Sequence, residues 1–118
     1  MIGDLGAADA TALAELVARG EVSPSELLDA ALAAVEARNP AINAVVLLQE
    51  GVARKSIADG LPPGPFRGVP FLIKDLDNVA GVVTRFGSAA TAGQPPAEKD
   101  DTFVAATFAA GLICIGKS

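Results

Sequence analysis

Several residue types are nearly absent from this 118-residue sequence, which contains no histidine, no tryptophan and a single cysteine, Cys114. One cysteine cannot form a disulfide within the chain, and this indicates a reducing compartment. Cys114 lies in the short apolar run at residues 112–115, where packing is its expected role.

Positive charge and long apolar runs are also scarce. Nine Lys and Arg residues stand against fourteen Asp and Glu residues, for a net charge of −5. The basic residues are scattered, so no stretch can neutralise several phosphates, and direct binding of nucleic acid is not expected. No apolar run approaches the roughly 20 residues of a membrane helix, and the first residues lack the basic region of a secretory leader. We therefore expect a cytoplasmic protein without membrane contact.

Helices are predicted in the first third of the chain. Asp9 can cap a helix that ends near Gly20. The sequence SPSE at residues 23–26 has the form of a capping box with proline at the first helical position, and it predicts a second helix through Arg38 that residues 39–40 stop. Hydrophobic residues make up 51% of the sequence, enough for one small domain with a modest core.

Strands and helices are expected to alternate in the rest of the chain. Apolar runs predict strands at residues 42–48, 69–73 and 112–115, and residues 52–59 read as a short helix closed by Gly60.

The segment 75–88 has the mixture of apolar and turn residues typical of strands and turns, and residues 89–99 are a plausible exposed excursion. Asp100 and Asp101 are expected to cap a further helix, with Phe103, Val104, Thr107 and Phe108 on one face. The predicted fold class is α/β: N-terminal helices followed by part of a mixed sheet with flanking helices.

Lys74 is the candidate catalytic residue, because it directly follows the strand at 69–73. A lysine held at the end of a buried strand can be desolvated, and a desolvated ammonium loses its proton more readily than a free one. The alternative is a solvated or ion-paired surface lysine. Asp75 and Asp77 leave the question open, since they could either hold Lys74 charged or point to solvent.

The motif around Lys74 resembles the amidase signature family. The resemblance is carried by GVPFLIKDL at residues 68–76, VAG at 79–81 and TRFGS at 84–88, and it extends over nearly the whole chain, from the SPSEL helix start at 23–27 to Gly116 and Lys117. It implies the α/β/α fold of that family. It also implies that residues 1–118 are the N-terminal portion of a single domain, an N-terminal fragment that ends before the glycine- and serine-rich signature.

The resemblance implies hydrolysis of a carboxamide to a carboxylate and ammonia or an amine by a Ser-Ser-Lys triad. Lys74 matches the triad lysine and would act as general base through a bridging serine, while both serines would lie beyond residue 118. The expected partner is a small-molecule amide, with no cofactor and no metal, and a homodimer is left open. We expect the fragment alone to be inactive. The alternatives are the glutamine-hydrolysing subunit of a tRNA amidotransferase, and a small non-catalytic α/β interaction domain.

Two further patterns have competing interpretations. GLICIGKS at residues 111–118 has the spacing of a phosphate-binding loop, but its bulky, β-branched middle predicts a strand, so no nucleotide site is expected. Under the resemblance it corresponds to a Gly-Lys-Thr-Asn strand end, with Ser118 in place of threonine. Ser88 is interpreted as structural, and Ser23, Ser25 and Ser56 belong to helices.

Overall fold

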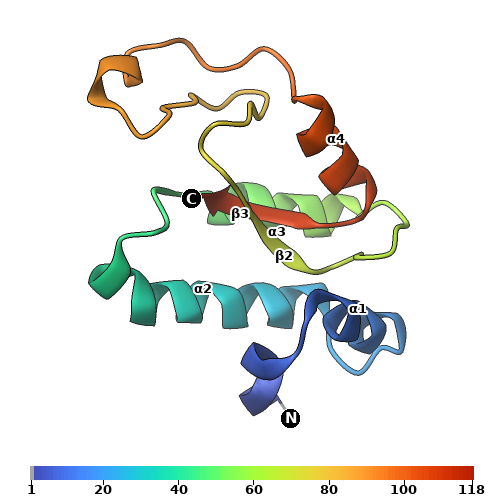
Figure 1. Cartoon of the computed structure of the whole chain (residues 1–118). Coiled ribbons are helices and arrows are strands. Elements are labelled where there is room, and N and C mark those ends of the chain that lie inside the picture. Colours follow the sequence, from blue (N-terminus) through green and yellow to red (C-terminus); the bar gives the residue numbers. More distant parts are fainter. Residues whose placement is uncertain (1) are drawn as a thin grey trace.

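The computed structural model describes residues 2–118 and confirms the predicted mixed α/β class (Figure 1). The elements in chain order are η1 (Ile2–Ala7), α1 (Ala10–Ala18), α2 (Pro24–Ile42), β1 (Leu47–Leu48), α3 (Glu50–Asp59), β2 (Pro70–Ile73), η2 (Ala89–Thr91), α4 (Thr102–Ala109) and β3 (Ile113–Lys117).

The three strands form one sheet in the order β1-β3-β2. Strand β3 is central, antiparallel to β1 and parallel to β2. Phe71 pairs with Cys114 but Leu72 pairs with Gly116, so Ile115 is an extra residue that forms a bulge. Because β2 and β3 run in the same direction, their carboxyl ends meet at one edge of the sheet.

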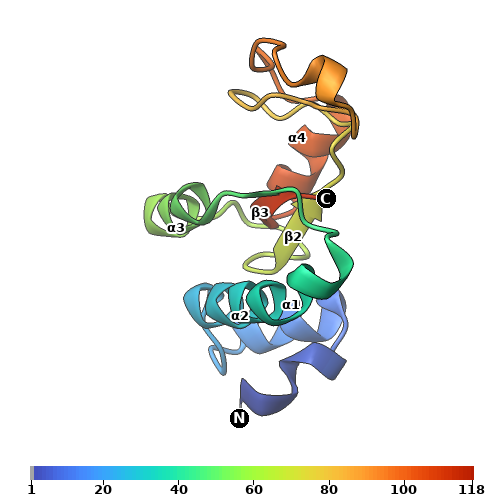
Figure 2. The same cartoon turned by 90° about the vertical axis from the view of Figure 1, so that its left-hand side faces the viewer.

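The core lies on both faces of β3, whose side chains alternate between them. Helices α2 and α3 contribute to one cluster and α4 to the other, and Figure 2 shows α2 and α4 on opposite sides of the strands. The first cluster consists of Leu28, Ala53, Leu61, Ile113 and Ile115. The second consists of Ile73, Val79, Val104 and Cys114.

The predicted starts of the first two helices are confirmed, whereas α3 begins at Glu50, two residues before the predicted start. Asp9 caps α1 by accepting a hydrogen bond from the Ala12 amide at 2.9 Å. At the start of α2, the Glu26 amide donates to Ser23 Oγ at 3.1 Å and the Ser23 amide donates to Glu26 Oε2 at 2.8 Å, which is the reciprocal capping box that the sequence predicts. Helix α3 is followed by Gly60 with φ of 93°, as expected for a helix end.

The predicted end of the second helix was wrong, because α2 continues through Pro40 to Ile42. Pro40 removes its own N–H from the helical ladder, but the next turn still closes because the Asn43 amide donates to the Asn39 carbonyl at 2.6 Å. Asn43 has a left-handed φ of 49°, which ends the helix. The strand predicted at 42–48 is therefore reduced to Leu47–Leu48.

Residues 75–88 contain no strand, contrary to the mixture expected from their composition. This segment and residues 89–101 form an irregular excursion that is closed by its own backbone bonds: the Gly81 amide donates to the Ala97 carbonyl at 2.8 Å, and the Ala97 amide to the Val82 carbonyl at 3.0 Å. The excursion is the loop at the top of Figure 1.

The expected cap of α4 was also wrong in its details. Asp101 holds the N-cap position, but its carboxylate makes no capping bond. The carboxylates of Asp100 and Asp101 instead accept the amides of Ala80 and Asn78, both at 2.7 Å, because the irregular excursion leaves those amides without strand partners. Phe103 is 53% exposed and does not share the buried face of Val104.

Candidate active site

Lys74 follows β2 directly, at the edge where the carboxyl ends of β2 and β3 meet. The backbone on both sides of it is fixed: the Ser118 amide donates to the Ile73 carbonyl at 2.9 Å, and the Asp75 amide donates to the Ser118 carbonyl at 2.7 Å. A turn follows in which the Asp77 amide donates to the Lys74 carbonyl at 3.0 Å. The sequence correctly predicts that Lys74 follows a strand, although the strand begins at Pro70 rather than at Val69.

The Lys74 side chain is exposed. Strand β2 lies at the outer edge of the sheet, so its end is not enclosed by residues 2–118. None of the ion pairs within the described residues involves Lys74. The local expectation that the strand by itself desolvates this amine is therefore not met.

The buried lysine at this edge is Lys117, whose side chain is 1% exposed. Its Nζ lies 3.0 Å from Asp75 Oδ1 and 3.4 Å from Thr84 Oγ1. The Asp75 side chain is only 10% exposed. The sequence left open whether Asp75 pairs with Lys74 or points to solvent. The structure shows neither, because the Asp75 carboxylate pairs with Lys117.

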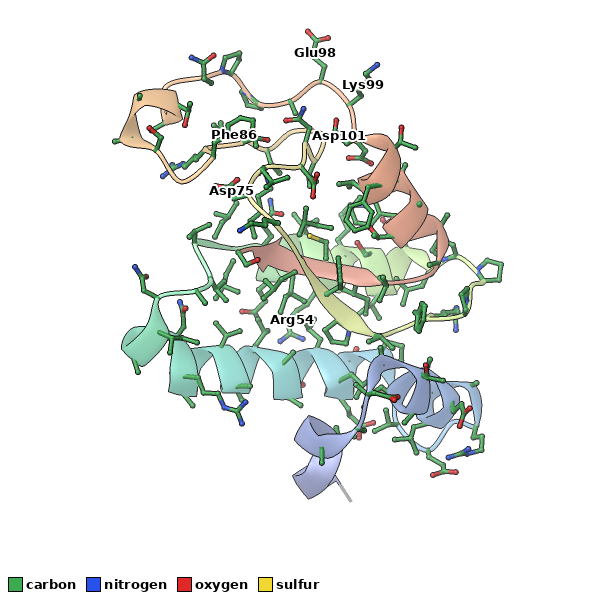
Figure 3. The ribbon with its side chains drawn as sticks, in the orientation of Figure 1. Arg54, Asp75, Phe86, Glu98, Lys99 and Asp101 are labelled. Carbon is green, nitrogen blue, oxygen red and sulfur yellow. The ribbon has the colours of Figure 1, made fainter. Side chains whose placement is uncertain are left out.

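Further hydrogen bonds connect this buried ion pair to the excursion. Thr84 Oγ1 donates to Asn78 Oδ1 at 2.7 Å, and the Asn78 amide donates to Asp101 at the start of α4. The Arg85 amide donates to Asp75 Oδ1 at 3.3 Å. Figure 3 shows Asp75 just above the sheet, with Asp101 at the start of α4. The polar network joins β2, β3, the excursion and α4 around the residue next to Lys74.

A cleft of about 310 Å³ opens beside the ion pair, between β1 and the excursion. Apolar side chains from both elements and the charged groups of Asp75, Arg85 and Lys117 line it. A cleft of this size with a few polar groups has the dimensions and lining typical of part of a small-molecule site.

The phosphate-loop pattern is not a phosphate site. Residues Ile113–Lys117 form β3, and all five are buried. Strand geometry turns successive amides to opposite sides, so they cannot converge on an anion as a phosphate loop requires. Burial raises the pKa of the Cys114 thiol within this strand, which agrees with a packing role.

Ser88 has a structural role, since its Oγ accepts the Ala90 amide at 3.2 Å and caps η2. Lys117 is the residue whose importance the sequence did not reveal. The available signal was a second lysine at the end of a second apolar strand, because parallel strands bring their carboxyl ends together.

Within residues 2–118, no cluster of three or more Asp, Glu or Cys residues has the arrangement of a metal site. In the same part of the chain, no helix is both long and apolar enough to cross a membrane.

The Amidase family model matches residues 26–118. The chain belongs to the amidase signature family. Among curated family members it is 44% identical over 113 residues to the 6-aminohexanoate-cyclic-dimer hydrolase of Paenarthrobacter ureafaciens, covering 93% of this chain and 22% of that protein. It is 37% identical over 123 residues to a component of the glutamyl-tRNA(Gln) amidotransferase of Salinispora arenicola, covering 98% of this chain and 25% of that protein.

A solved structure of 6-aminohexanoate cyclic dimer hydrolase complexed with substrate shares this part of the amidase signature fold. It superposes with a TM-score of 0.84 at 40% identity, over 93% of this chain and 23% of the other. The chain thus spans less than a quarter of the length of the curated hydrolase and of the solved hydrolase structure. Residues 2–118 supply the β2 and β3 strand ends with Lys74 and the Asp75–Lys117 pair.

Proposed function

We propose that the complete protein hydrolyses carboxamides and that Lys74 is its general base. The neutral Lys74 amine accepts a proton from a bridging serine, which takes the proton of a nucleophilic serine as that hydroxyl attacks the amide carbonyl. The C–N bond breaks, the amine or ammonia leaves with a proton, and water hydrolyses the acyl-serine to the carboxylate. Both serines belong to chain beyond residue 118, within the same domain.

The observation that carries the proposal is that Lys74 directly follows β2 in a chain that belongs to a family of amide hydrolases. It stands at the strand end, and its backbone is clamped by the hydrogen bonds of Ile73 and Asp75 to Ser118. Fixed backbone at this point limits where the amine can reach, which a base in a hydrogen-bonded triad requires. The exposed flank of β2 leaves room for further chain to cover the amine and exclude water.

The roles of three of the five serines within residues 1–118 support a nucleophile from elsewhere in the protein. Ser23 caps α2, Ser88 caps η2, and the Ser56 hydroxyl donates to the Val52 carbonyl within α3 at 3.0 Å. Each of these hydroxyls already serves local structure. The isolated segment is therefore expected to be inactive.

The substrate that we propose is a small carboxamide. The relative from Paenarthrobacter ureafaciens is named for a cyclic amide dimer, and the cleft beside Asp75 and Lys117 has mixed polar and apolar walls. The second candidate is glutamine hydrolysis within a tRNA amidotransferase, which the similarity to the Salinispora arenicola amidotransferase component favours. The two candidates are separated by comparing the turnover of free glutamine with that of a panel of aliphatic and aryl amides. Faster turnover of the simple amides favours the first candidate, and faster turnover of glutamine favours the second.

Substitution of Lys74 in the full-length enzyme tests the proposal. General bases contribute about 100- to 10,000-fold, and triad members act as a unit, so Lys74→Ala is expected to lose activity at or beyond the upper limit. Lys74→Arg keeps the charge but cannot act as a base, because a guanidinium stays protonated, and it should be equally inactive. Near-normal amide turnover by Lys74→Arg would remove Lys74 from catalysis and favour a surface lysine without a catalytic role.

A further inference from the structure

We propose that Lys117 is a positioning residue for the reaction: by pairing with Asp75, it keeps the carboxylate adjacent to Lys74 from holding the Lys74 amine in its protonated form. The inference rests on the proposed function, since it concerns the protonation of the proposed base. It adds a role for a buried lysine that the proposed Ser-Ser-Lys triad does not use.

The geometry commits the Asp75 carboxylate to Lys117. Asp75 Oδ1 accepts Lys117 Nζ at 3.0 Å and the Arg85 amide at 3.3 Å. The Lys117 ammonium in turn contacts Thr84 Oγ1, and its side chain is 1% exposed, so it is fixed within the protein rather than mobile in solvent. A carboxylate with a buried cation and a backbone donor has little negative charge to offer another amine.

The pairing of Asp75 with Lys117 affects Lys74 because Asp75 is the next residue in the chain. Lys74 and Asp75 share a peptide unit, so an Asp75 carboxylate left without Lys117 would add negative potential around Lys74, and negative potential favours the ammonium form of lysine, which cannot accept a proton. The charged groups gathered at this edge are Lys74, Asp75 and Asp77 after β2, Arg85 in the excursion, Asp100 and Asp101 before α4, and Lys117 on β3. Lys117 is the buried cation of this set that pairs directly with Asp75.

Asp75 and Lys117 also stabilise each other within the fold, so removal of one can destabilise the protein. A buried charge that loses its partner is strongly unfavourable, whereas replacement of both partners by neutral groups is often tolerated. A double substitution of Asp75 and Lys117 therefore separates loss of the fold from loss of charge compensation.

The test compares the pH dependence of kcat/KM in full-length Lys117→Met, Asp75→Asn and the double variant, with folding of each checked by circular dichroism. The acid limb of kcat/KM reports the base in the free enzyme. In Lys117→Met, the uncompensated Asp75 carboxylate should move that limb up by about 1 pH unit. In Asp75→Asn, the uncompensated Lys117 ammonium should move it down, and the double variant should return it close to the wild-type position.

The matched control is Arg54→Met, which removes the cation of exposed ion pairs with Asp29 on α2 and Glu50 on α3 and should leave the limb unmoved. If Lys117→Met does not fold, the downward shift in Asp75→Asn and its reversal in the double variant carry the test. An acid limb that stays in place in every folded variant would overturn the inference and make the pair purely structural. That result is distinct from failure of the proposed function, in which Lys74→Ala keeps its turnover.

Discussion

At the scale of single residues, Gly116 determines how closely β1 approaches β3. A Cβ at this position would lie 2.0 Å from the Leu47 carbonyl oxygen and 3.0 Å from its carbon. Both contacts are with backbone, which cannot rotate away as a side chain could. Gly116 therefore lets the antiparallel pair form beside the Lys117 ion pair.

Gly116→Ala is expected to destabilise the full-length protein by about 2–3 kcal/mol, through overpacking and displacement of β1. Thermal unfolding followed by circular dichroism measures the loss. Gly51→Ala is the matched control, because a Cβ at Gly51 in α3 meets nothing within 4 Å. Equal melting temperatures for the two variants would contradict the close approach of β1.

The Cys114 thiol should resist alkylation in the native protein. Burial raises its pKa, so at pH 8 it holds less thiolate than a free cysteine, and iodoacetamide should react about tenfold more slowly or worse. As the pH rises past the ordinary thiol value, the unfolded chain binds fewer protons than the native one, so native stability falls. Mass spectrometry with and without denaturant measures the rates, and equal rates would show that Cys114 is accessible.

At the scale of elements, the capping box gives α2 a pH-dependent start. The hydrogen bond from the Ser23 amide, followed by that from its hydroxyl, lowers the pKa of Glu26. A lowered carboxyl pKa stabilises the folded form above the ordinary glutamate value, and this contribution disappears as the pH falls through the lowered one.

A peptide of residues 21–45 should accordingly lose helicity in acid, measured by circular dichroism between pH 7 and pH 2. Glu26→Gln should reduce the decrease in helicity between pH 7 and pH 2. Glu36→Gln, farther along the same helix, should leave that decrease unchanged. Ser23→Ala should reduce helicity at all pH values, since a lost cap costs about 1 kcal/mol. Identical pH curves for the two glutamine variants would exclude the capping box as the cause.

The sequence predicts elements best where local chemistry alone decides. Asp9, the Ser23–Glu26 box and Gly60 each satisfy or end a helix with neighbouring residues, and these boundaries are confirmed. Pro40 misleads because the next turn closes through the Asn43 amide. Asp101 misleads because its carboxylate serves Asn78, 23 positions away in sequence. Tertiary partners of this kind leave no local pattern.

In the candidate site, too, the sequence predicts the feature set by local residues and misses the one set by tertiary contacts. The motif around Lys74 gives its place at a strand end, whereas the Asp75–Lys117 pair spans 42 residues and depends on which strands become neighbours. The parallel pairing of β2 with β3 brings Asp75 and Lys117 together. This pairing depends on the whole fold and cannot be read from the sequence of either strand alone.

At the scale of the whole molecule, residues 2–118 leave apolar side chains in solvent around a short sheet. β1 contains only two residues, and β2 has an open edge. Open edges and exposed apolar groups favour association with other chain. The large apolar residues exposed here are Ile42, Val46, Leu47, Leu48, Val52, Leu76, Phe86 and Phe103.

Purified residues 1–118 should therefore be poorly ordered, self-associate with rising concentration, and hydrolyse no simple amide above background. Light scattering, amide dispersion in NMR spectra and an ammonia-release assay check these outcomes. A monomer with a cooperative thermal transition would instead show a finished domain. Lys74-dependent turnover by the isolated segment would mean that a nucleophile lies within it.

The 42 residues between Asp75 and Lys117 also affect the protein while it is being synthesised. A ribosome adds about 5–20 residues per second, so β2 emerges several seconds before the strand that pairs with it. During that interval an apolar strand edge is free to pair with another nascent chain. Lys74, Asp75 and Asp77 stand directly behind the strand, where charges act as gatekeepers against such pairing. The lysine that we propose as the base of the finished enzyme thus stands, with its neighbouring aspartates, where charge would also discourage mispairing of the growing chain.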